Sequence, residues 1–212
     1  MPVGNDIVDL QDPEALPGAS HPRFDLRVFT RDERARLLRC HRPTTLRWRF
    51  WAAKESAFKA ARQLDQSTRF LPRRFTLGPW EGAGYRVVHS DGARFRVRIE
   101  ATHGWIHAVA APDPSDEVGR SFLESDTMRD SDRTIQVQRI EGPRTACDPG
   151  GRVRELAATA AASLLSLCPS EIRIRKVAGI PRAERRGRVL PVSISLSHHG
   201  RFVACACVLE QG

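Results

Sequence analysis

The interpretation of this chain starts from residues 51–60, Trp-Ala-Ala-Lys-Glu-Ser-Ala-Phe-Lys-Ala. The protein has 34 lysine and arginine residues, but only three are lysine, and two of those, Lys54 and Lys59, lie in this stretch. On a helix, Trp51, Glu55 and Lys59 would share one face. An ammonium beside a carboxylate suits a site for a metal ion and phosphate, because lysine acts as a point charge. An ordinary surface ion pair has the same spacing and remains the alternative.

A second informative stretch is residues 4–10, Gly-Asn-Asp-Ile-Val-Asp-Leu, near the N-terminus. Its apolar residues predict a short buried strand. A carboxylate such as Asp6 is costly to bury unless it is paired or binds a metal ion. Capping of the turn before Pro13 by Asp6 and Asp9 is the alternative interpretation.

Taken in order, residues 4–7, 27–33 and 51–60 resemble the 4′-phosphopantetheinyl transferase superfamily. The pattern of that family is a G-x-D strand followed by W-x-x-K-E-x-x-x-K on a helix, and the separation of the two motifs also fits. Residues 70–75, Phe-Leu-Pro-Arg-Arg-Phe, are similar to the strand that follows the second motif.

The C-terminal part extends the resemblance. Residues 179–181 and 191–204 are similar to the G-x-P and S-x-S-H segments of the family. These segments come first in the two-lobed, surfactin-type members, whereas here they come last. The chain therefore resembles a circularly permuted two-lobed member, or a unit like holo-acyl-carrier-protein synthase doubled in one chain.

An internal similarity supports a doubling. Residues 103–110 and 199–206 both read His-Gly-x-apolar-x-Ala-x-Ala, although two short segments can also align by chance. We expect an α+β fold of two pseudo-symmetric lobes, each a small antiparallel sheet packed with helices. The first lobe would span residues 1–112 and the second 133–212, with one active site at their interface. The segment 113–132 holds seven acidic and two basic residues and is expected to be a linker or mobile loop.

Periodicity and turn residues predict the individual elements. The first lobe should have strands at 4–10, 73–77, 84–89, 93–100 and 104–110, with helices at 31–39 and 44–63. Thr30 and Glu33 form a capping-box pattern at the start of the first helix. The second lobe should have strands at 134–140, 171–177, 191–196 and 201–209, with a helix at 152–166.

Composition limits the class of protein. No apolar run reaches the length of about 18 residues that a membrane-spanning helix needs. Five scattered cysteines favour reduced thiols, and the first residues do not resemble a secretory signal, so we expect a cytoplasmic protein. Two fused lobes make a monomer the simplest assembly.

The resemblance implies an enzyme of the holo-acyl-carrier-protein-synthase type. It would transfer 4′-phosphopantetheine from coenzyme A to a serine of an apo carrier protein, depend on Mg²⁺, and release 3′,5′-ADP. Asp6 and Glu55 match the metal ligands of the family. Many two-lobed members have a second acid where this chain has Val8, and Asp9 should point to the opposite face of the strand from Asp6.

The resemblance also implies roles for other residues. Glu55, or a water that it orients, would be the base for the serine hydroxyl, and Lys59 would stabilise the diphosphate and the leaving group. Ser197 and His198 match residues that bind the phosphates of coenzyme A. Lys54 is a further phosphate-binding candidate, and Arg27 is a candidate for the 3′-phosphate.

Two other functions fit parts of the sequence. A net charge of +9 and a pI near 10.3 suit a nucleic-acid-binding protein. However, arginines are spread along predicted strands, as at positions 94, 96 and 98, and the chain has no zinc-ligand spacing. A transferase fold without activity, serving as a scaffold, is the other alternative. The positive charge also suits an acidic carrier protein, with Arg34, Arg36, Arg39 and Arg42 as candidate contacts.

Overall fold

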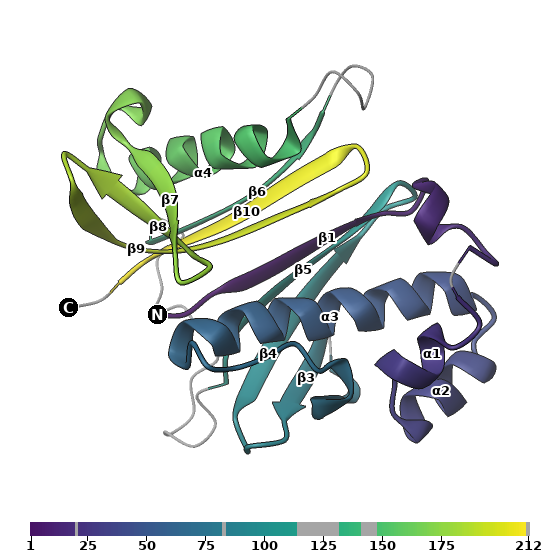
Figure 1. Ribbon diagram of the computed structural model, residues 1–212. Coiled ribbons are helices and arrows are strands. Elements are labelled where there is room, and N and C mark those ends of the chain that lie inside the picture. The colour runs from purple at the N-terminus through teal and green to yellow at the C-terminus, as the bar shows by residue number, and fades with distance from the viewer. Residues whose placement is uncertain (20, 82–83, 114–131, 141–147, 211–212) are drawn as a thin grey trace.

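The computed structural model describes residues 1–19, 21–81, 84–113, 132–140 and 148–210. The chain forms two lobes, each with a five-stranded antiparallel sheet and one long helix packed against it (Figure 1). This confirms the expected α+β class with two lobes. Most of the expected linker, residues 114–131, lies outside the described residues.

The first lobe has the strand order β1-β5-β4-β3-β2. The strands are β1 (Gly4–Asp9), β2 (Phe75–Glu81), β3 (Gly84–His89), β4 (Arg94–Ala101) and β5 (Trp105–Pro112). The helix α3 (Pro43–Leu64) crosses the sheet, and its alanines pack against the buried aromatic residues of the lobe. Two short helices, α1 (Phe24–Val28) and α2 (Arg31–Leu38), lie at one end of α3 (Figure 1). Two 3-10 turns, η1 (Pro13–Ala15) and η2 (Pro72–Arg74), complete the lobe.

Gly4 allows β1 to lie directly against α3. A Cβ at this position would overlap the carbonyl oxygen of Ser56 and would come within 2.7 Å of the backbone nitrogen of Ala60. Only glycine therefore fits this contact without moving the strand. Because Asp6 follows two residues later on the same face of the strand, the close approach also brings its carboxylate to the helix.

The second lobe repeats this plan with the strand order β6-β10-β9-β8-β7. Its strands are β6 (Arg133–Arg139), β7 (Arg173–Val177), β8 (Ile180–Arg185), β9 (Arg188–His199) and β10 (Phe202–Leu209). The helix α4 (Pro149–Leu165) packs on the sheet through its alanines, and the 3-10 turn η6 (Pro169–Glu171) follows it.

The two lobes have the same connectivity. In each, a first strand leads to a long helix and then to a four-stranded meander, whose last strand pairs with the first. The two His-Gly sequences occupy matching places, immediately before β5 and at the turn from the end of β9 into β10. The internal similarity in the sequence therefore corresponds to a repeated fold.

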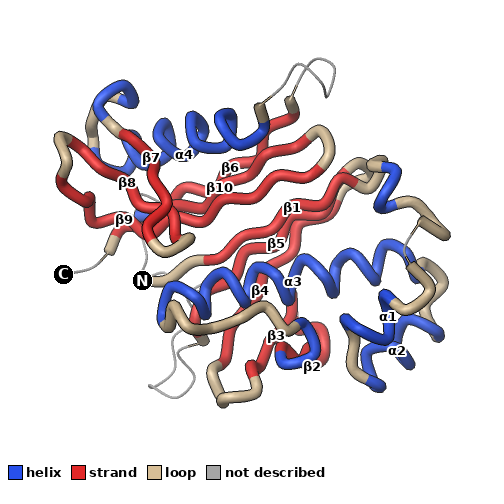
Figure 2. The backbone as a smooth tube through the Cα atoms, in the orientation of Figure 1, coloured by secondary structure: helices blue, strands red, loops and turns tan. Residues whose placement is uncertain are grey.

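The lobes meet along β1 and β9, which run side by side through the middle of the molecule (Figure 2). β1 is an edge strand of its sheet, so alternate N–H groups of its backbone have no partner strand. Those of Asn5, Ile7 and Asp9 donate to side chains of β9: Ser195 Oγ at 2.8 Å, Ser197 Oγ at 3.1 Å and His199 Nδ1 at 3.0 Å. We call these three hydrogen bonds the seam, because they join the two lobes.

Several smaller expectations can be compared with the structure. The capping box of Thr30 and Glu33 is present with both of its hydrogen bonds. The helix α1 and the strand β8 were not predicted, and β8 contains Pro181, which disfavours a strand assignment. Among the described residues, no helix is long and apolar enough to cross a membrane. Four of the five cysteines lie within the described residues, and all four are free thiols.

Candidate active site

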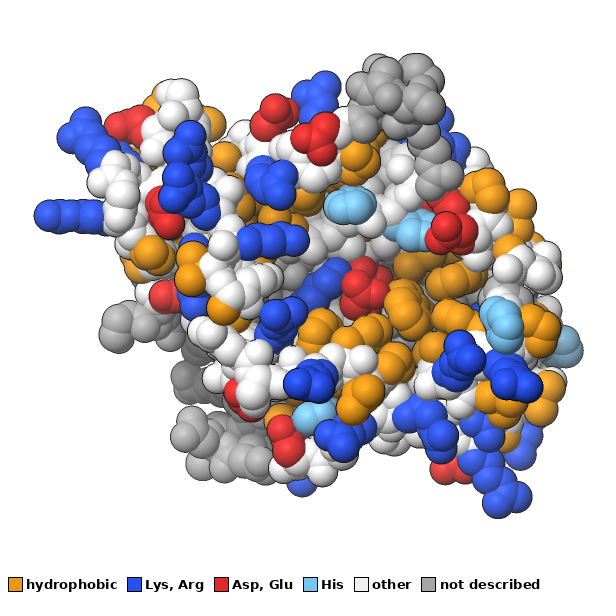
Figure 3. Space-filling view, viewed as in Figure 1, with side chains coloured by type: hydrophobic (Ala, Val, Ile, Leu, Met, Phe, Trp, Pro, Cys, Tyr) orange, Lys and Arg blue, Asp and Glu red, His pale blue; other side chains and the backbone are white. Residues whose placement is uncertain are grey.

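A pocket of about 510 Å³ lies between the two lobes. On the face seen in Figure 3, acidic, basic, histidine and hydrophobic side chains surround the hollow between the two lobes. The first lobe lines the pocket with residues from β1, η1, α1 and α3: Asp6, Ile7, Val8, Glu14, Phe24, Trp48, Trp51, Glu55 and Lys59. The second lobe lines it with residues from α4, β7 and β9: Gly150, Val153, Arg154, Lys176, Leu196, Ser197, His198 and His199.

Asp6, Glu55 and Lys59 converge on the first-lobe side of this pocket. Glu55 and Lys59 are one helical turn apart on α3, and Asp6 faces them from β1. The Lys59 ammonium lies 3.0 Å from Asp6 Oδ1 and 3.2 Å from Glu55 Oε1. It also donates to the carbonyl oxygen of Asn5 at 2.9 Å, so three acceptors surround the three N–H groups of this ammonium. The structure thus brings together the two predicted metal ligands and the predicted phosphate-binding lysine.

The electrostatics of this group favour a bound cation. Burial, reinforced by the nearby Glu55 carboxylate, raises the pKa of Asp6 to about 7, although Lys59 and Ser197 act in the opposite direction. Burial would lower the pKa of Lys59, but Asp6 and Glu55 outweigh it and raise that pKa. One ammonium therefore does not fully compensate two carboxylates, and a divalent cation would complete the neutralisation.

One oxygen of Asp6 is left over. Oδ1 accepts from Ser197 and Lys59, whereas Oδ2 is buried and has no hydrogen-bond partner among the described residues. A buried carboxylate oxygen without a donor is costly, and Mg²⁺ is bound through one or two carboxylates and substrate phosphates. The residues present therefore fit a Mg²⁺ site formed by Asp6 and Glu55.

Ser197 and His198 lie on β9 at the second-lobe wall of the pocket. The Ser197 hydroxyl donates to Asp6 Oδ1 at 2.8 Å and accepts from the backbone N–H of Ile7. Burial, together with Lys59, lowers the pKa of His198, which favours the neutral form of its imidazole. A neutral imidazole can still donate one hydrogen bond to a phosphate.

Lys54 does not line the pocket. Its side chain is fully buried elsewhere, with Nζ 2.7 Å from Glu33 Oε2 and hydrogen-bonded to the carbonyl oxygens of Pro72 and Phe75. Glu33 also accepts from the backbone N–H groups of Thr30 and Leu77. This pair therefore ties α3 to α2 and β2, and the structure does not bring Lys54 to the predicted phosphate site.

Two other positions of interest from the sequence also lie apart from the pocket centre. Arg27 is an exposed residue of α1 and does not line the pocket. Asp9 is held by Arg201, with both carboxylate oxygens 2.8 Å from its guanidinium. Burial would raise the pKa of Asp9, but the hydrogen bonds from Arg201 prevail and lower it to about 2. Val8 lines the pocket but offers no ligand atom, so Asp6 is the acid that β1 contributes there.

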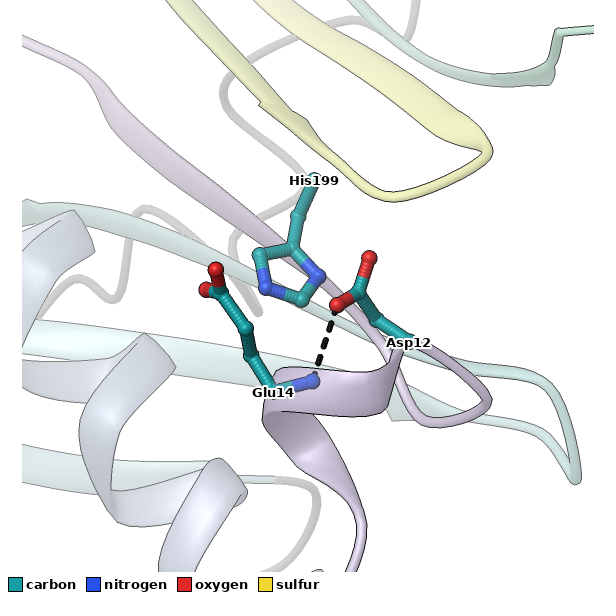
Figure 4. Close-up of side chains that lie close together, drawn as sticks. All are labelled: Asp12, Glu14 and His199. Atoms are coloured by element: carbon teal, nitrogen blue, oxygen red, sulfur yellow. Dashed lines mark hydrogen bonds between the residues drawn. The ribbon is translucent and has the colours of Figure 1, made fainter. Parts of the chain in front are cut away.

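A second group of polar side chains lies at the edge of the pocket. Asp12, Glu14 and His199 have potential ligand atoms within 4.8 Å of one another, with the imidazole between the two acids (Figure 4). His199 Nδ1 accepts the N–H of Asp9, so the neutral ring carries its proton on Nε2. The ring then has no free lone pair for a metal ion, and the group is better described as the end of the seam.

Sequence reasoning missed several residues of the pocket. Phe24 forms an aromatic wall with Trp51, which was already expected on the helix face of Glu55 and Lys59, and the two ring centroids are 5.5 Å apart. Arg154 and Lys176 add positive charge from the second lobe. Lys176 had a usable signal: it is the third lysine of a chain that otherwise uses arginine, and the other pocket lysine, Lys59, was identified in that way.

The chain was compared with known proteins. The family model described as 4′-phosphopantetheinyl transferase superfamily matches residues 2–110, just over half of the 212 residues. The matched part covers nearly the whole first lobe and includes Asp6, Glu55 and Lys59. No curated protein matches the chain.

Proposed function

The chain belongs to the 4′-phosphopantetheinyl transferase superfamily, and we propose that it transfers 4′-phosphopantetheine from coenzyme A to a serine of an apo carrier protein. We further propose that the transfer depends on Mg²⁺, releases 3′,5′-ADP and is of the holo-acyl-carrier-protein-synthase type. The observation that carries the proposal is the meeting of Asp6, Glu55 and Lys59 in the pocket between the lobes.

The chemistry is a displacement at phosphorus. The carrier serine oxygen attacks the phosphorus that carries the pantetheine arm, and the bond from that phosphorus to the bridging oxygen of the diphosphate breaks. The 3′,5′-ADP leaves with the bridging oxygen, and the serine gives up its proton. Catalysis of such reactions rests on positioning and on neutralising the negative charge of the phosphates.

Residues of the first lobe have separate proposed roles in this reaction. Glu55 is partly exposed to the pocket and is the candidate base for the serine hydroxyl, directly or through a water. The Lys59 ammonium borders the same pocket, and its proposed role is to neutralise the charge of the diphosphate. Mg²⁺ held by Asp6 and Glu55 would neutralise the diphosphate and polarise its phosphorus–oxygen bonds.

The second lobe supplies the opposite wall. The lowered pKa of His198 favours the neutral imidazole, which can contribute a hydrogen bond to a phosphate. Arg154 and Lys176 line the same pocket and provide the positive charge. We therefore propose that this wall contacts the phosphates of coenzyme A from the side opposite Lys59, and that the apolar parts of coenzyme A pack against the aromatic wall of Trp51 and Phe24.

The proposed partner is an acidic carrier protein, which suits the net charge of +9. Arg34 and Arg36 are engaged inside the protein, because Arg34 donates to the carbonyl oxygen of Phe29 and Arg36 to those of Leu77 and Gly78. Of the four arginines named from the sequence, Arg39 and Arg42 are exposed and are the better candidates for the carrier contact.

Intact-protein mass spectrometry tests the proposal. A panel of apo carrier proteins is incubated with the protein, coenzyme A and Mg²⁺. We expect one carrier to gain the mass of a phosphopantetheine, and a chelator to prevent this. Asp6→Asn and Glu55→Gln should abolish the gain, whereas Glu155→Gln, at an exposed position of α4 outside the pocket, should leave it unchanged. Full activity of both pocket variants would refute the metal assignment.

A further inference from the structure

We propose that Ser197 is a positioning residue for the metal ion: its hydroxyl, supplied by the second lobe, determines which oxygen of Asp6 is free to bind Mg²⁺. This inference rests on the proposed function, because it concerns the metal that the reaction would use. It gives Ser197 a role different from the coenzyme A contact that the resemblance implies.

Alternate residues of β9 form the seam with β1. Ser195, Ser197 and His199 alternate along β9, and each accepts one backbone N–H of β1. Both serines are buried, at 2% and 6% exposure, and both hydroxyls use one acceptor position in this way. As elements that join the lobes, Ser195 and Ser197 are therefore equivalent.

Ser197 differs from Ser195 in the hydrogen bond that its hydroxyl donates. Its hydroxyl proton is donated to Asp6 Oδ1 at 2.8 Å, across a sequence separation of 191 residues. A serine hydroxyl has a single proton to donate. Ser197 therefore cannot donate to a phosphate of coenzyme A without releasing Asp6, whereas its bond to Asp6 requires no ligand.

The two carboxylate oxygens of Asp6 have different surroundings. Oδ1 accepts both from Ser197 and from Lys59, so its lone pairs are engaged on one side of the carboxylate. Among the described residues Oδ2 is buried without a hydrogen-bond partner, and it is the oxygen left for a cation. Without the Ser197 hydroxyl, Lys59 would be the one donor to this carboxylate within the described part of the chain, and the carboxylate could turn. Hydrogen bonds of this kind to metal-binding carboxylates typically account for 10-fold to 100-fold in metal affinity.

The chain offers a matched control. Ser197→Ala removes the bond to Asp6 and one bond of the seam, whereas Ser195→Ala removes a bond of the seam alone. The difference between the two variants isolates the bond to Asp6. Ser197→Thr keeps a hydroxyl on the same backbone position and serves as the rescue variant.

The dissociation constant for Mn²⁺ is measured without coenzyme A, and electron paramagnetic resonance reports the concentration of the free ion. We expect the dissociation constant to rise at least about 10-fold in Ser197→Ala, to change less than 3-fold in Ser195→Ala, and to return toward the parent value in Ser197→Thr. Equal weakening in both alanine variants would show a general effect of loosening the seam and would overturn the inference. Unchanged Mn²⁺ affinity in both alanine variants would also overturn the inference.

Binding of 3′,5′-ADP in the presence of a chelator completes the test. We expect the affinity of Ser197→Ala for this nucleotide to match that of the parent. A loss of nucleotide affinity with unchanged Mn²⁺ affinity would make Ser197 a substrate contact and overturn the inference alone. A parent protein that binds no Mn²⁺ without coenzyme A would overturn the inference alone, because in the proposed function the phosphates of coenzyme A also supply ligands to the metal ion.

Discussion

Replacement of Lys54 by methionine tests whether the two lysines of the W-x-x-K-E-x-x-x-K motif have different tasks. Lys54 and Glu33 are both buried, at 0% and 1% side-chain exposure, and their charged atoms are 2.7 Å apart. The ammonium also satisfies the carbonyl oxygens of Pro72 and Phe75. Methionine fills a similar volume but leaves Glu33 as a buried charge without its counterion.

The expected loss of stability follows from this geometry. Breaking a buried ion pair by removing one partner costs about 3–5 kcal/mol, which is a large share of the roughly 5–15 kcal/mol that stabilises a typical domain. Burial lowers the pKa of Lys54, and the Glu33 charge opposes this effect, so the ammonium itself depends on Glu33. The double variant Lys54→Met/Glu33→Gln no longer carries a buried charge and should recover part of the loss.

Urea unfolding followed by tryptophan fluorescence measures the effect. Lys176→Met is the matched control, because it removes an exposed lysine of the pocket and should change stability by less than about 0.5 kcal/mol. For the folded fraction of Lys54→Met we expect unchanged affinity for 3′,5′-ADP. A loss of stability below about 1 kcal/mol together with weaker nucleotide binding would refute the structural role and favour phosphate binding by Lys54.

Three further predictions concern other parts of the molecule. Gly4→Ala should destabilise the protein by more than about 1 kcal/mol in urea unfolding, because the added Cβ overlaps the backbone of α3; an unchanged midpoint would contradict the close contact. Burial, with Lys59, lowers the pKa of His107 to about 4 from an ordinary 6.5. As pH falls, the unfolded chain therefore binds a proton at this histidine before the folded protein does. On the order of 3 kcal/mol of folding stability is present above pH 6.5 and should be lost between pH 6.5 and pH 4. The variant His107→Asn should show a smaller loss over that range, and identical pH profiles would exclude the effect. Lys176→Met should weaken 3′,5′-ADP binding in isothermal titration, and unaltered affinity would remove Lys176 from the phosphate wall.

Much of the fold could be predicted because its signals are local. The capping box of Thr30 and Glu33, the long helix around Glu55 and the alternating strands all depend on residues close in the chain. The doubling was visible because the repeated His-Gly segments precede equivalent strands. By contrast, β8 was not predicted, because it contains Pro181 and a proline within a strand removes a ladder hydrogen bond.

The site was harder to predict because it joins residues from both ends of the chain. Asp6, Glu55 and Lys59 were found through their motifs, and the structure brings them together. Lys54 was grouped with them by sequence proximity, although a residue next to Glu55 on a helix points about 100° away from it. The bond between Ser197 and Asp6 spans nearly the whole chain, and nothing local to either residue indicates it.

The most direct test of the central claim is a crystal structure with Mn²⁺ and coenzyme A, in which anomalous scattering locates the metal. We expect a Mn²⁺ ion bound by Asp6 and Glu55 in the pocket between the lobes, with the diphosphate beside Lys59. Coenzyme A outside this pocket, or a metal ion bound by Asp12, Glu14 and His199 with none at Asp6, would contradict it.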